Sequence, residues 1–344
     1  MISRAAILKD FNSPMEIGQI SIPEPKKDEV ILRIKGAGVC ASDLEIIHSN
    51  IVREGFKLPF VLGHENAGVI ERVGEDVKGF EIGDTCLVYS VWGDMTCEKC
   101  RKGEYNLCPR MAVPGQSFYY GGFSEYMFIS SYRWLRKINS KRPEEYAPLA
   151  DAGTTSYAAV RKALDSVNYD PDSTIIIYGI GGIATYTIQI IKSMFPTVRV
   201  IACSRSEEKL SFADKLGADI SVKPDMLKET VRDFKTTSIA AIDLVGSQDS
   251  FSAINDSIGS YDASIIMVGL HGSKISFPVF DLVGGEKKII GSNYGTWSDF
   301  DSVCKLMDRN KIRSYIIPFS LDEINDALTM VSDGKNIGRV VITP

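Results

Sequence analysis

Basic residues are not in excess in this sequence: 39 Lys and Arg face 44 Asp and Glu, and the formal net charge is -5. Nucleic acids and anionic membranes attract proteins through positive surface charge. Neither is therefore expected as a partner, and a small-molecule role fits better. The sequence also begins without a secretory signal or transmembrane segment, because charge interrupts the first apolar run within ten residues. We expect a cytoplasmic protein.

The chain also lacks an even number of cysteines, which a full set of disulfide pairs would need. The chain has seven cysteines and no secretion signal, which argues against a disulfide framework and for thiols that stay reduced. Cys86, Cys203 and Cys304 are scattered among apolar neighbours, as small buried thiols usually are. No long polar linker or internal repeat appears, and a length of 344 residues favours two domains.

A compact cysteine cluster needs another explanation. Cys97, Cys100 and Cys108 follow Asp94 with the spacing D-x2-C-x2-C-x7-C in a strongly polar stretch. A C-x2-C pair binds one tetrahedral ion from a tight turn, and a third thiolate and a carboxylate complete the ligand set without an open position. We therefore predict a structural zinc site. Asp94 is its weakest ligand, because oxygen suits zinc less well than thiolate does, and water is the alternative.

Two further features carry metal-capable side chains. In Gly63-His64-Glu65, an imidazole and a carboxylate stand side by side, and both are ordinary zinc ligands. Alone, the pair is explained equally well as a turn with a hydrogen-bonded histidine and a surface glutamate. Asp151 stands among small and apolar residues with helical spacing. Taken alone, it is better explained as a helix N-cap than as a functional carboxylate.

The first part of the chain is predicted to be rich in β-strands. Residues 30–35 alternate between apolar and polar side chains, and residues 67–74 and 84–89 continue as strands between glycine turns. This pattern favours a partly closed antiparallel barrel over parallel βαβ packing.

From Ser173 onwards strands and helices alternate. A continuous apolar strand at 174–178 leads into the run GIGGIA, which begins at Gly179, and an amphipathic helix follows. This is the G-x-G-x-x-A fingerprint in its βαβ context, where a dinucleotide pyrophosphate lies on the helix N-terminus. We predict a dinucleotide site at Gly179, Gly181 and Gly182. The later segments complete six parallel strands in a doubly wound sheet.

The end of the next strand indicates which dinucleotide binds. An acid usually stands there and binds the ribose hydroxyls, but this chain has Ser204 followed by Arg205. No carboxylate repels a 2′-phosphate, and a guanidinium can pair with one. NADP(H) is therefore the predicted cofactor. The alternative is that Arg205 is a solvated surface residue and that the protein also uses NAD(H).

Together, these pieces resemble the zinc-containing medium-chain dehydrogenase/reductase family, in its alcohol dehydrogenase branch, over essentially the whole chain. The motifs that carry the resemblance occur in the family's order: Cys40-Ala-Ser42-Asp43, the segment from Gly63 to Gly74, the cysteine cluster, Asp151-Ala-Gly-Thr-Thr155, and 179–184. The resemblance implies an α/β fold in two domains. A GroES-like, β-rich partial barrel at 1–152 and 290–344 is the catalytic domain, and a Rossmann doubly wound parallel sheet occupies 153–289.

The resemblance also implies a second, catalytic zinc. Cys40, His64 and Asp151 would bind it, and Glu65 would be a nearby carboxylate that alternates with water or substrate as ligand. Many relatives have a cysteine where this chain has Asp151. A harder oxygen ligand should leave the zinc more electrophilic and more easily lost.

By the same matching, Asp43 would orient His64 from behind. Ser42 would receive the proton of the alcohol while hydride passes to the nicotinamide. In many relatives the proton relay continues to a histidine five residues after the cysteine, but here that position is Glu45. Glu45 or His48 could take this part, although His48 is better explained as a solvated helix residue.

Single matches imply further contacts with the cofactor. Besides the residues already named, the resemblance matches these residues to cofactor contacts: Thr155 behind the nicotinamide, Lys209 near the adenosine ribose, Val268, Gly269 and Leu270 along the nicotinamide site, and Arg339 at the pyrophosphate. Each of these matches is weaker than the motifs.

The implied function is zinc-dependent, reversible oxidation of a primary or secondary alcohol to an aldehyde or ketone with NADP(H). One alternative is a polyol or sugar dehydrogenase of the same family; another is a zinc-free, NADPH-dependent enone or quinone reductase. The latter would lack the Cys40, His64 and Asp151 set, which this chain keeps. Family analogy suggests a homo-oligomer, a dimer or homotetramer, built from the cofactor domains.

Overall fold

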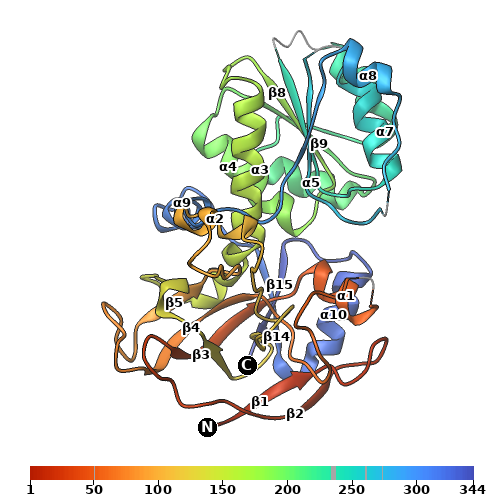
Figure 1. Cartoon of the computed structure of the whole chain (residues 1–344). Helices are drawn as coiled ribbons and strands as arrows, with labels where there is room; N and C mark the ends of the chain where they lie inside the picture. Colours follow the sequence, from red (N-terminus) through yellow and green to blue (C-terminus); the bar gives the residue numbers. More distant parts are fainter. Residues whose placement is uncertain (50, 234–237, 260–261, 273) are drawn as a thin grey trace. The chain divides into compact units, whose positions relative to one another are not determined.

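The structure is a computed structural model that describes residues 1–49, 51–233, 238–259, 262–272 and 274–344. It contains two compact units (Figure 1). Unit 1 consists of Met1–Ala152, Thr296–Cys304 and Ser314–Pro344, and unit 2 consists of Gly153–Gly295 and Lys305–Arg313. Unit 1 is therefore assembled from segments near both ends of the chain.

Unit 1 is built on a seven-stranded sheet of order β14-β15-β3-β4-β5-β7, in which β6 also pairs with β3. Within the described residues, β14 and β15 are the parallel pair of this sheet and its other pairs are antiparallel. The strands are β3 (Val30–Gly38), β4 (Glu65–Val73), β5 (Thr85–Val88), β6 (Tyr126–Ile129), β7 (Leu135–Lys137), β14 (Ile316–Ser320) and β15 (Arg339–Thr343). The predicted antiparallel, strand-rich first part is confirmed.

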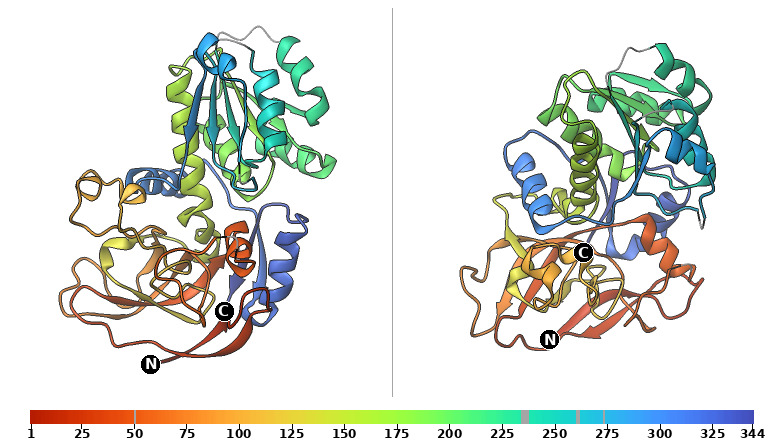
Figure 2. Two further views of the ribbon diagram at one scale, coloured as in Figure 1. Left: turned by 45° about the vertical axis from the view of Figure 1, so that its right-hand side comes forward. Right: turned by 45° about the horizontal axis from the view of Figure 1, so that its top comes forward.

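Smaller elements surround this sheet. A separate antiparallel pair is formed by β1 (Ile2–Ile7) and β2 (Glu16–Ser21). The α-helices of unit 1 are α1 (Ala41–Ile47), α2 (Glu98–Arg101) and α10 (Ile324–Ser332), and α9 (Trp297–Asp308) has residues in both units. The 3-10 helices are η1 (Tyr105–Leu107), η2 (Tyr132–Trp134), η3 (Pro143–Glu145), η4 (Ala147–Ala150) and η6 (Leu321–Glu323). Both views of Figure 2 show α1 beside α10, which contacts it.

The β3 and β4 strands bring distant motifs to one end of the sheet. In their antiparallel register, Gly38 at the end of β3 lies opposite Glu65 at the start of β4. Cys40 follows β3 and caps α1, and His64 immediately precedes β4. In an antiparallel pair, one strand ends at the edge where the other begins. Cys40 and His64, which are 24 positions apart in sequence, therefore become neighbours in space.

Unit 2 is a parallel sheet of six strands in the order β10-β9-β8-β11-β12-β13. Its strands are β8 (Thr174–Tyr178), β9 (Arg199–Cys203), β10 (Ile220–Val222), β11 (Ile239–Asp243), β12 (Ser264–Met267) and β13 (Lys288–Gly291). This is the order of a doubly wound nucleotide-binding sheet, in which the first strand lies in the middle. The predicted parallel sheet is confirmed.

Helices cover both faces of this sheet, and Figure 1 shows α4 and α7 on opposite sides of it. The helices are α3 (Ala152–Ser166), α4 (Gly182–Met194), α5 (Glu207–Leu216), η5 (Pro224–Met226), α6 (Leu227–Asp233), α7 (Gln248–Ser257) and α8 (Val279–Gly284). One core layer joins Ile176 and Ile201 of the strands to Leu227 of α6 and Phe251 of α7. Strands buried on both faces need continuous apolar sequence, as at 174–178.

No helix within the described residues is long and apolar enough to cross a membrane.

Candidate active site and metal centres

Cys40, His64 and Asp151 meet in the interior of unit 1. Asp151 follows η4 and immediately precedes α3. Its Oδ2 lies 3.2 Å from His64 Nε2 and 3.9 Å from Cys40 Sγ. All three residues are buried, and their candidate ligand atoms lie within 4.8 Å of one another. The structure therefore brings together the three residues that the family resemblance assigns to a catalytic zinc.

The spacing of these atoms fits a tetrahedral metal ion. Zinc binds sulfur at about 2.3 Å and imidazole nitrogen or carboxylate oxygen at about 2.0–2.2 Å, so neighbouring ligand atoms stand roughly 3.3–3.8 Å apart. The separations of 3.2 and 3.9 Å bracket this range. Three protein ligands leave one of four tetrahedral positions open, which is the arrangement of a catalytic rather than a structural zinc.

His64 is oriented from behind by Asp43. The buried Asp43 Oδ1 accepts no hydrogen bond of good geometry within the described residues, and His64 Nδ1 lies 3.3 Å from it. A proton on Nδ1 satisfies this oxygen and leaves the Nε2 lone pair for a metal. Burial lowers the pKa of His64, but the carboxylates of Asp43 and Asp151 outweigh burial and raise the pKa well above its usual value. Such a concentration of negative charge suits a cation.

Glu65 stands outside this group. Arg339 binds its carboxylate bidentately, with Nε–Oε2 and Nη2–Oε1 distances of 2.9 and 2.5 Å. The amide of Ala152 also donates to Oε1 at 3.0 Å. Burial raises the pKa of Glu65, although Arg339 opposes this shift. Glu65 as an alternating metal ligand and Arg339 as a pyrophosphate ligand stay predictions, because in this structure the two side chains bind each other.

Gly38 makes room for the Glu65 carboxylate. A Cβ on Gly38 would overlap Glu65 Oε2 and would also lie 2.9 Å from Glu65 Cβ. Only a residue without a side chain fits at this point of the β3–β4 pair.

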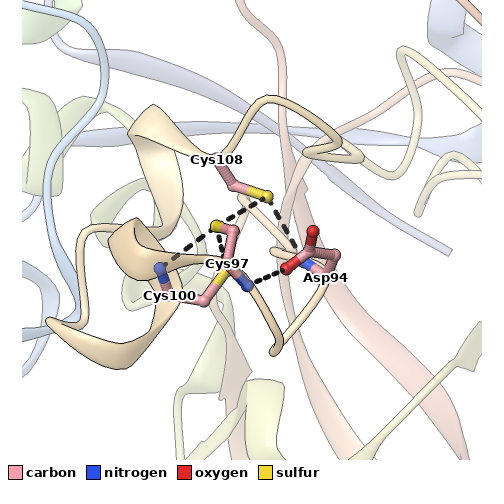
Figure 3. Close-up of side chains that lie close together, drawn as sticks. All are labelled: Asp94, Cys97, Cys100 and Cys108. Carbon is pink, nitrogen blue, oxygen red and sulfur yellow. Dashed lines mark hydrogen bonds between the residues drawn. The ribbon is translucent and has the colours of Figure 1, made fainter.

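The cysteine cluster forms a second, closed group. Figure 3 shows the side chains of Asp94, Cys97, Cys100 and Cys108 gathered at one point. Cys97 Sγ lies 3.5 Å from Cys100 Sγ and 3.7 Å from Cys108 Sγ, close to the roughly 3.8 Å between two thiolates on one zinc ion. The backbone N–H groups of Cys100 and Asp94 donate to sulfurs of the cluster. With four protein ligands, no position remains for substrate.

Asp94 is fixed by this turn. The backbone N–H groups of Cys97 and Thr96 donate to its Oδ1 and lower its pKa. Its other oxygen, Oδ2, is buried without a hydrogen bond of good geometry and forms an ion pair with the exposed Arg110. The carboxylate therefore stays charged, as a fourth zinc ligand must be.

The dinucleotide fingerprint adopts the predicted strand-turn-helix geometry in unit 2. Gly179 has a positive φ of 95°, and a Cβ there would lie 2.6 Å from Val245 Cγ2. Gly181 is the N-cap of α4, which begins at Gly182. The first turn of α4 therefore directs free backbone N–H groups and its positive dipole end towards this turn.

Ser204 and Arg205 follow β9, as expected. Ser204 Oγ accepts from the backbone N–H of Ser206, which caps α5. Lys209 lies in the first turn of α5, and burial together with the charge of Arg205 lowers its pKa. Two cations therefore lie close together at the strand end where a 2′-phosphate would bind.

The remaining predicted cofactor residues occupy two other elements of unit 2. Thr155 is buried in the first turns of α3. Val268, Gly269 and Leu270 follow β12, and the backbone N–H groups of Val268 and Gly269 both donate to the carbonyl of Asp243.

Sequence reasoning did not identify Gln116. This side chain is 1% exposed, and its Nε2 lies 2.9 Å from Ser42 Oγ and 3.2 Å from His64 Nδ1. Arg53 Nε donates to Gln116 Oε1 at 3.1 Å. No motif contains Gln116 or Arg53, and only the fold brings their loops together. The suggested outer relay through His48 has less support, because its Nδ1 lies 3.2 Å from Asn12 Oδ1 on the exposed surface.

Two family models match the chain: the alcohol dehydrogenase GroES-like domain at residues 26–140 and the zinc-binding dehydrogenase domain at residues 182–309. The D-arabinose 1-dehydrogenase (NADP(+)) of Saccharolobus solfataricus is 45% identical over 99% of this chain and 98% of its own length. The chain belongs to the zinc-containing medium-chain dehydrogenase/reductase family, in its alcohol dehydrogenase branch. It is an oxidoreductase.

Other members of the family are similar to this dehydrogenase over its whole length. An NAD-dependent alcohol dehydrogenase of Sulfurisphaera tokodaii is 34% identical over 99% of this chain and all of its own length. The crystal structure of the Aeropyrum pernix alcohol dehydrogenase, 35% identical, has a TM-score of 0.91 and covers 99% of this chain and 100% of that chain. The predicted fold, with GroES-like and Rossmann parts, is confirmed. A nicotinamide cofactor is common to the family, while the relatives' names include both NADP and NAD.

Replacing Gly38 by alanine should destabilise the dehydrogenase by about 1–3 kcal/mol, because the added methyl group overpacks the Glu65 carboxylate and disturbs its pairing with Arg339. Thermal unfolding measures the change. Gly291→Ala is the matched control, since a Cβ at Gly291, also in a strand, meets no atom within 4 Å. Equal melting temperatures for the two variants would contradict the close-packing argument.

Proposed function

We propose that this dehydrogenase binds two zinc ions and transfers hydride reversibly between a hydroxyl-bearing carbon and NADP(H). The observation that carries the proposal is the buried group of Cys40, His64 and Asp151, three residues that would hold a zinc ion able to polarise a substrate oxygen. Asp94, Cys97, Cys100 and Cys108 would hold the structural zinc. The zinc-free reductase alternative has no use for such a group.

When bound, the catalytic zinc supplies Lewis acidity, which lowers the pKa of a substrate hydroxyl. The residues of the chain then orient the substrate and move its proton. Ser42 lies in the first turn of α1, and its Oγ and His64 Nδ1 lie 2.9 and 3.2 Å from the same atom, Gln116 Nε2. Its hydroxyl would accept the proton of the substrate while it passes its own proton outward to solvent. Asp43 holds the imidazole of His64 in the tautomer that exposes Nε2.

Preference for NADP(H) rests on charge at the end of β9. Ser204 stands where an acid would bind ribose hydroxyls, and Arg205 and Lys209 supply positive charge beside it. An arginine pairs with a phosphate through two directed N–H groups.

A sugar is the second candidate substrate class, and the relative named D-arabinose 1-dehydrogenase (NADP(+)) favours it. Its identity of 45% exceeds the 34% of the NAD-dependent alcohol dehydrogenase of Sulfurisphaera tokodaii. As this second candidate, beside oxidation of simple primary or secondary alcohols, we propose oxidation of a hydroxyl group of an aldose.

We also propose a homo-oligomer, because the surface of unit 2 carries exposed apolar side chains. On α8, Val279, Phe280 and Val283 are 69%, 81% and 69% exposed, and β13 is the end strand of the parallel sheet. Exposed apolar side chains beside a free strand edge suit contact with a second copy of the chain.

The metal proposal predicts two zinc ions per chain in protein purified without added metal. Asp151→Ala should lose one zinc and nearly all activity, whereas Cys97→Ala should lose the other, because the two groups share no ligand. Elemental analysis with a parallel NADP+-reduction assay measures both. Full zinc content in Asp151→Ala, or activity that survives its loss, would refute the catalytic site.

The cofactor proposal predicts that Arg205→Ala raises the KM for NADP+ about tenfold, because a charged hydrogen bond to the 2′-phosphate is lost. The KM for NAD+ should stay nearly unchanged. Arg232→Ala removes an exposed arginine on α6 and is the charge-matched control. Equal effects of Arg205→Ala on the two cofactors would argue against NADP preference.

The sugar proposal predicts that kcat/KM for aldopentoses such as D-arabinose exceeds that for ethanol, 2-propanol and benzyl alcohol about 100-fold. A site that pairs with several hydroxyl groups rejects substrates that lack them. Initial rates with NADP+ across this panel decide the question. A higher kcat/KM for the simple alcohols would contradict the sugar proposal and would favour a general alcohol dehydrogenase.

A further inference from the structure

Gln116 is a buried polar side chain that the proposed chemistry has not yet used. Its Nε2 donates to Ser42 Oγ at 2.9 Å, and its Oε1 accepts from Arg53 Nε at 3.1 Å. The side chain is 1% exposed. A buried amide keeps both ends hydrogen-bonded because desolvation without partners is costly.

Arg53 determines which way the amide points. An arginine Nε–H can only donate, so the atom that faces it must be the carbonyl oxygen of Gln116. The NH2 group then faces Ser42 Oγ and His64 Nδ1. A metal on His64 Nε2 would require the proton on Nδ1, which faces Asp43 Oδ1 at 3.3 Å. In that tautomer Nδ1 cannot accept from the amide, so the hydrogen bond that the amide donates in this direction is the one to Ser42.

Two loops are held against each other around this contact. The backbone N–H of Phe118 donates to the carbonyl of Gly55, which ties the loop of Gln116 to the loop of Arg53. Gly115 packs so closely on the backbone of Gly63 that a Cβ would lie 2.6 Å from the Gly63 carbonyl oxygen. Gln116 is therefore fixed both to the Arg53 loop and to the turn that carries His64.

The hydrogen bond from Gln116 restricts what Ser42 can do. A serine hydroxyl has one proton and two lone pairs. The amide of Gln116 takes one lone pair, which leaves one lone pair to accept a proton from substrate and one proton to pass outward. An N–H donor also stabilises negative charge that develops on Oγ as a proton leaves.

We propose that Gln116, oriented by Arg53, is a positioning residue that fixes the hydrogen-bond direction of the Ser42 hydroxyl for proton transfer. The inference rests on the proposed role of Ser42 in accepting the proton of substrate. It gives functions to two residues that lie outside every motif of the family resemblance. Gln116 acts through Ser42 and not on substrate.

A double-mutant cycle tests this inference on the purified, zinc-loaded full chain. Gln116→Leu keeps the size of the side chain and removes both polar ends, and it should lower kcat about tenfold. The KM for NADP+ and the zinc content should stay as in the wild type. In a Ser42→Ala background, Gln116→Leu should cause no further loss of kcat, because the group it positions is absent.

Gln116→Glu and Arg53→Met extend the cycle. A carboxylate in place of the amide can only accept, so it should draw the Ser42 proton towards itself and lower kcat more than Gln116→Leu does. Arg53→Met removes the group that orients the amide from a partly exposed position, which keeps the test open should the buried variant fail to fold. Its loss of kcat should also vanish with Ser42→Ala. Arg142→Met, an exposed arginine of unit 1, is the control.

The outcomes separate the inference from the proposed function. If Ser42→Ala keeps its kcat, the proposed proton route through Ser42 is wrong and the inference falls with it. If Ser42→Ala loses kcat but the Gln116 and Arg53 variants keep theirs, the route stands and the positioning role is wrong. The same holds if those variants lower kcat by equal factors with and without Ser42.

Discussion

Unit 1 buries several charged side chains at one end of the β3–β4 pair, and each of these charges needs a partner of opposite sign. Asp43, Glu65 and Asp151 lie there with exposed fractions of 0%, 0% and 7%. An unpaired buried charge costs several kcal/mol or neutralises itself through its pKa. Arg339 neutralises Glu65, whereas the other two carboxylates face one imidazole. A divalent cation beside His64 would balance this excess, so the buried carboxylates that need a positive partner are the same side chains that could hold a metal ion.

The two candidate metal groups differ in how the chain supplies their proposed ligands. Asp94 and the cysteines of its cluster come from one local segment, so a turn with backbone hydrogen bonds is enough to gather them. The candidate catalytic group takes its members from three separate places, since Cys40 follows β3, His64 precedes β4 and Asp151 precedes α3. The geometry of this group therefore depends on the sheet and not on one local turn. Ligands held by a sheet suit a metal site that would keep one coordination position for substrate.

The same difference explains how much could be predicted from the sequence. The cysteine spacing and the GIGGIA run are local patterns with local chemistry, and continuous apolar strands predict a parallel sheet. Cys40, His64 and Asp151 were brought together by resemblance to a family, since nothing local in Asp151 distinguishes a ligand from a helix cap. Gln116, Arg53 and Gly38 could not be found, because their roles arise from loop contacts and strand register. The hydrogen bonds between Arg339 and Glu65 could not be predicted either, because strand pairing brings these two distant residues together, while the role of Arg339 at the pyrophosphate stays a prediction.

The pairing of β15 with β3 has a consequence for the order in which the molecule forms. β15 lies beside the end of β3, with Val341 opposite Gly38, and it carries the only cation that binds Glu65 within the described residues. All strands of the parallel sheet lie within the continuous stretch Gly153–Gly295. During synthesis, all strands of the parallel sheet have therefore been translated before Arg339, the partner of Glu65, is added to the chain. The Glu65–Arg339 ion pair, although Glu65 comes early in the chain, is therefore completed only after the sequence of the parallel sheet is complete.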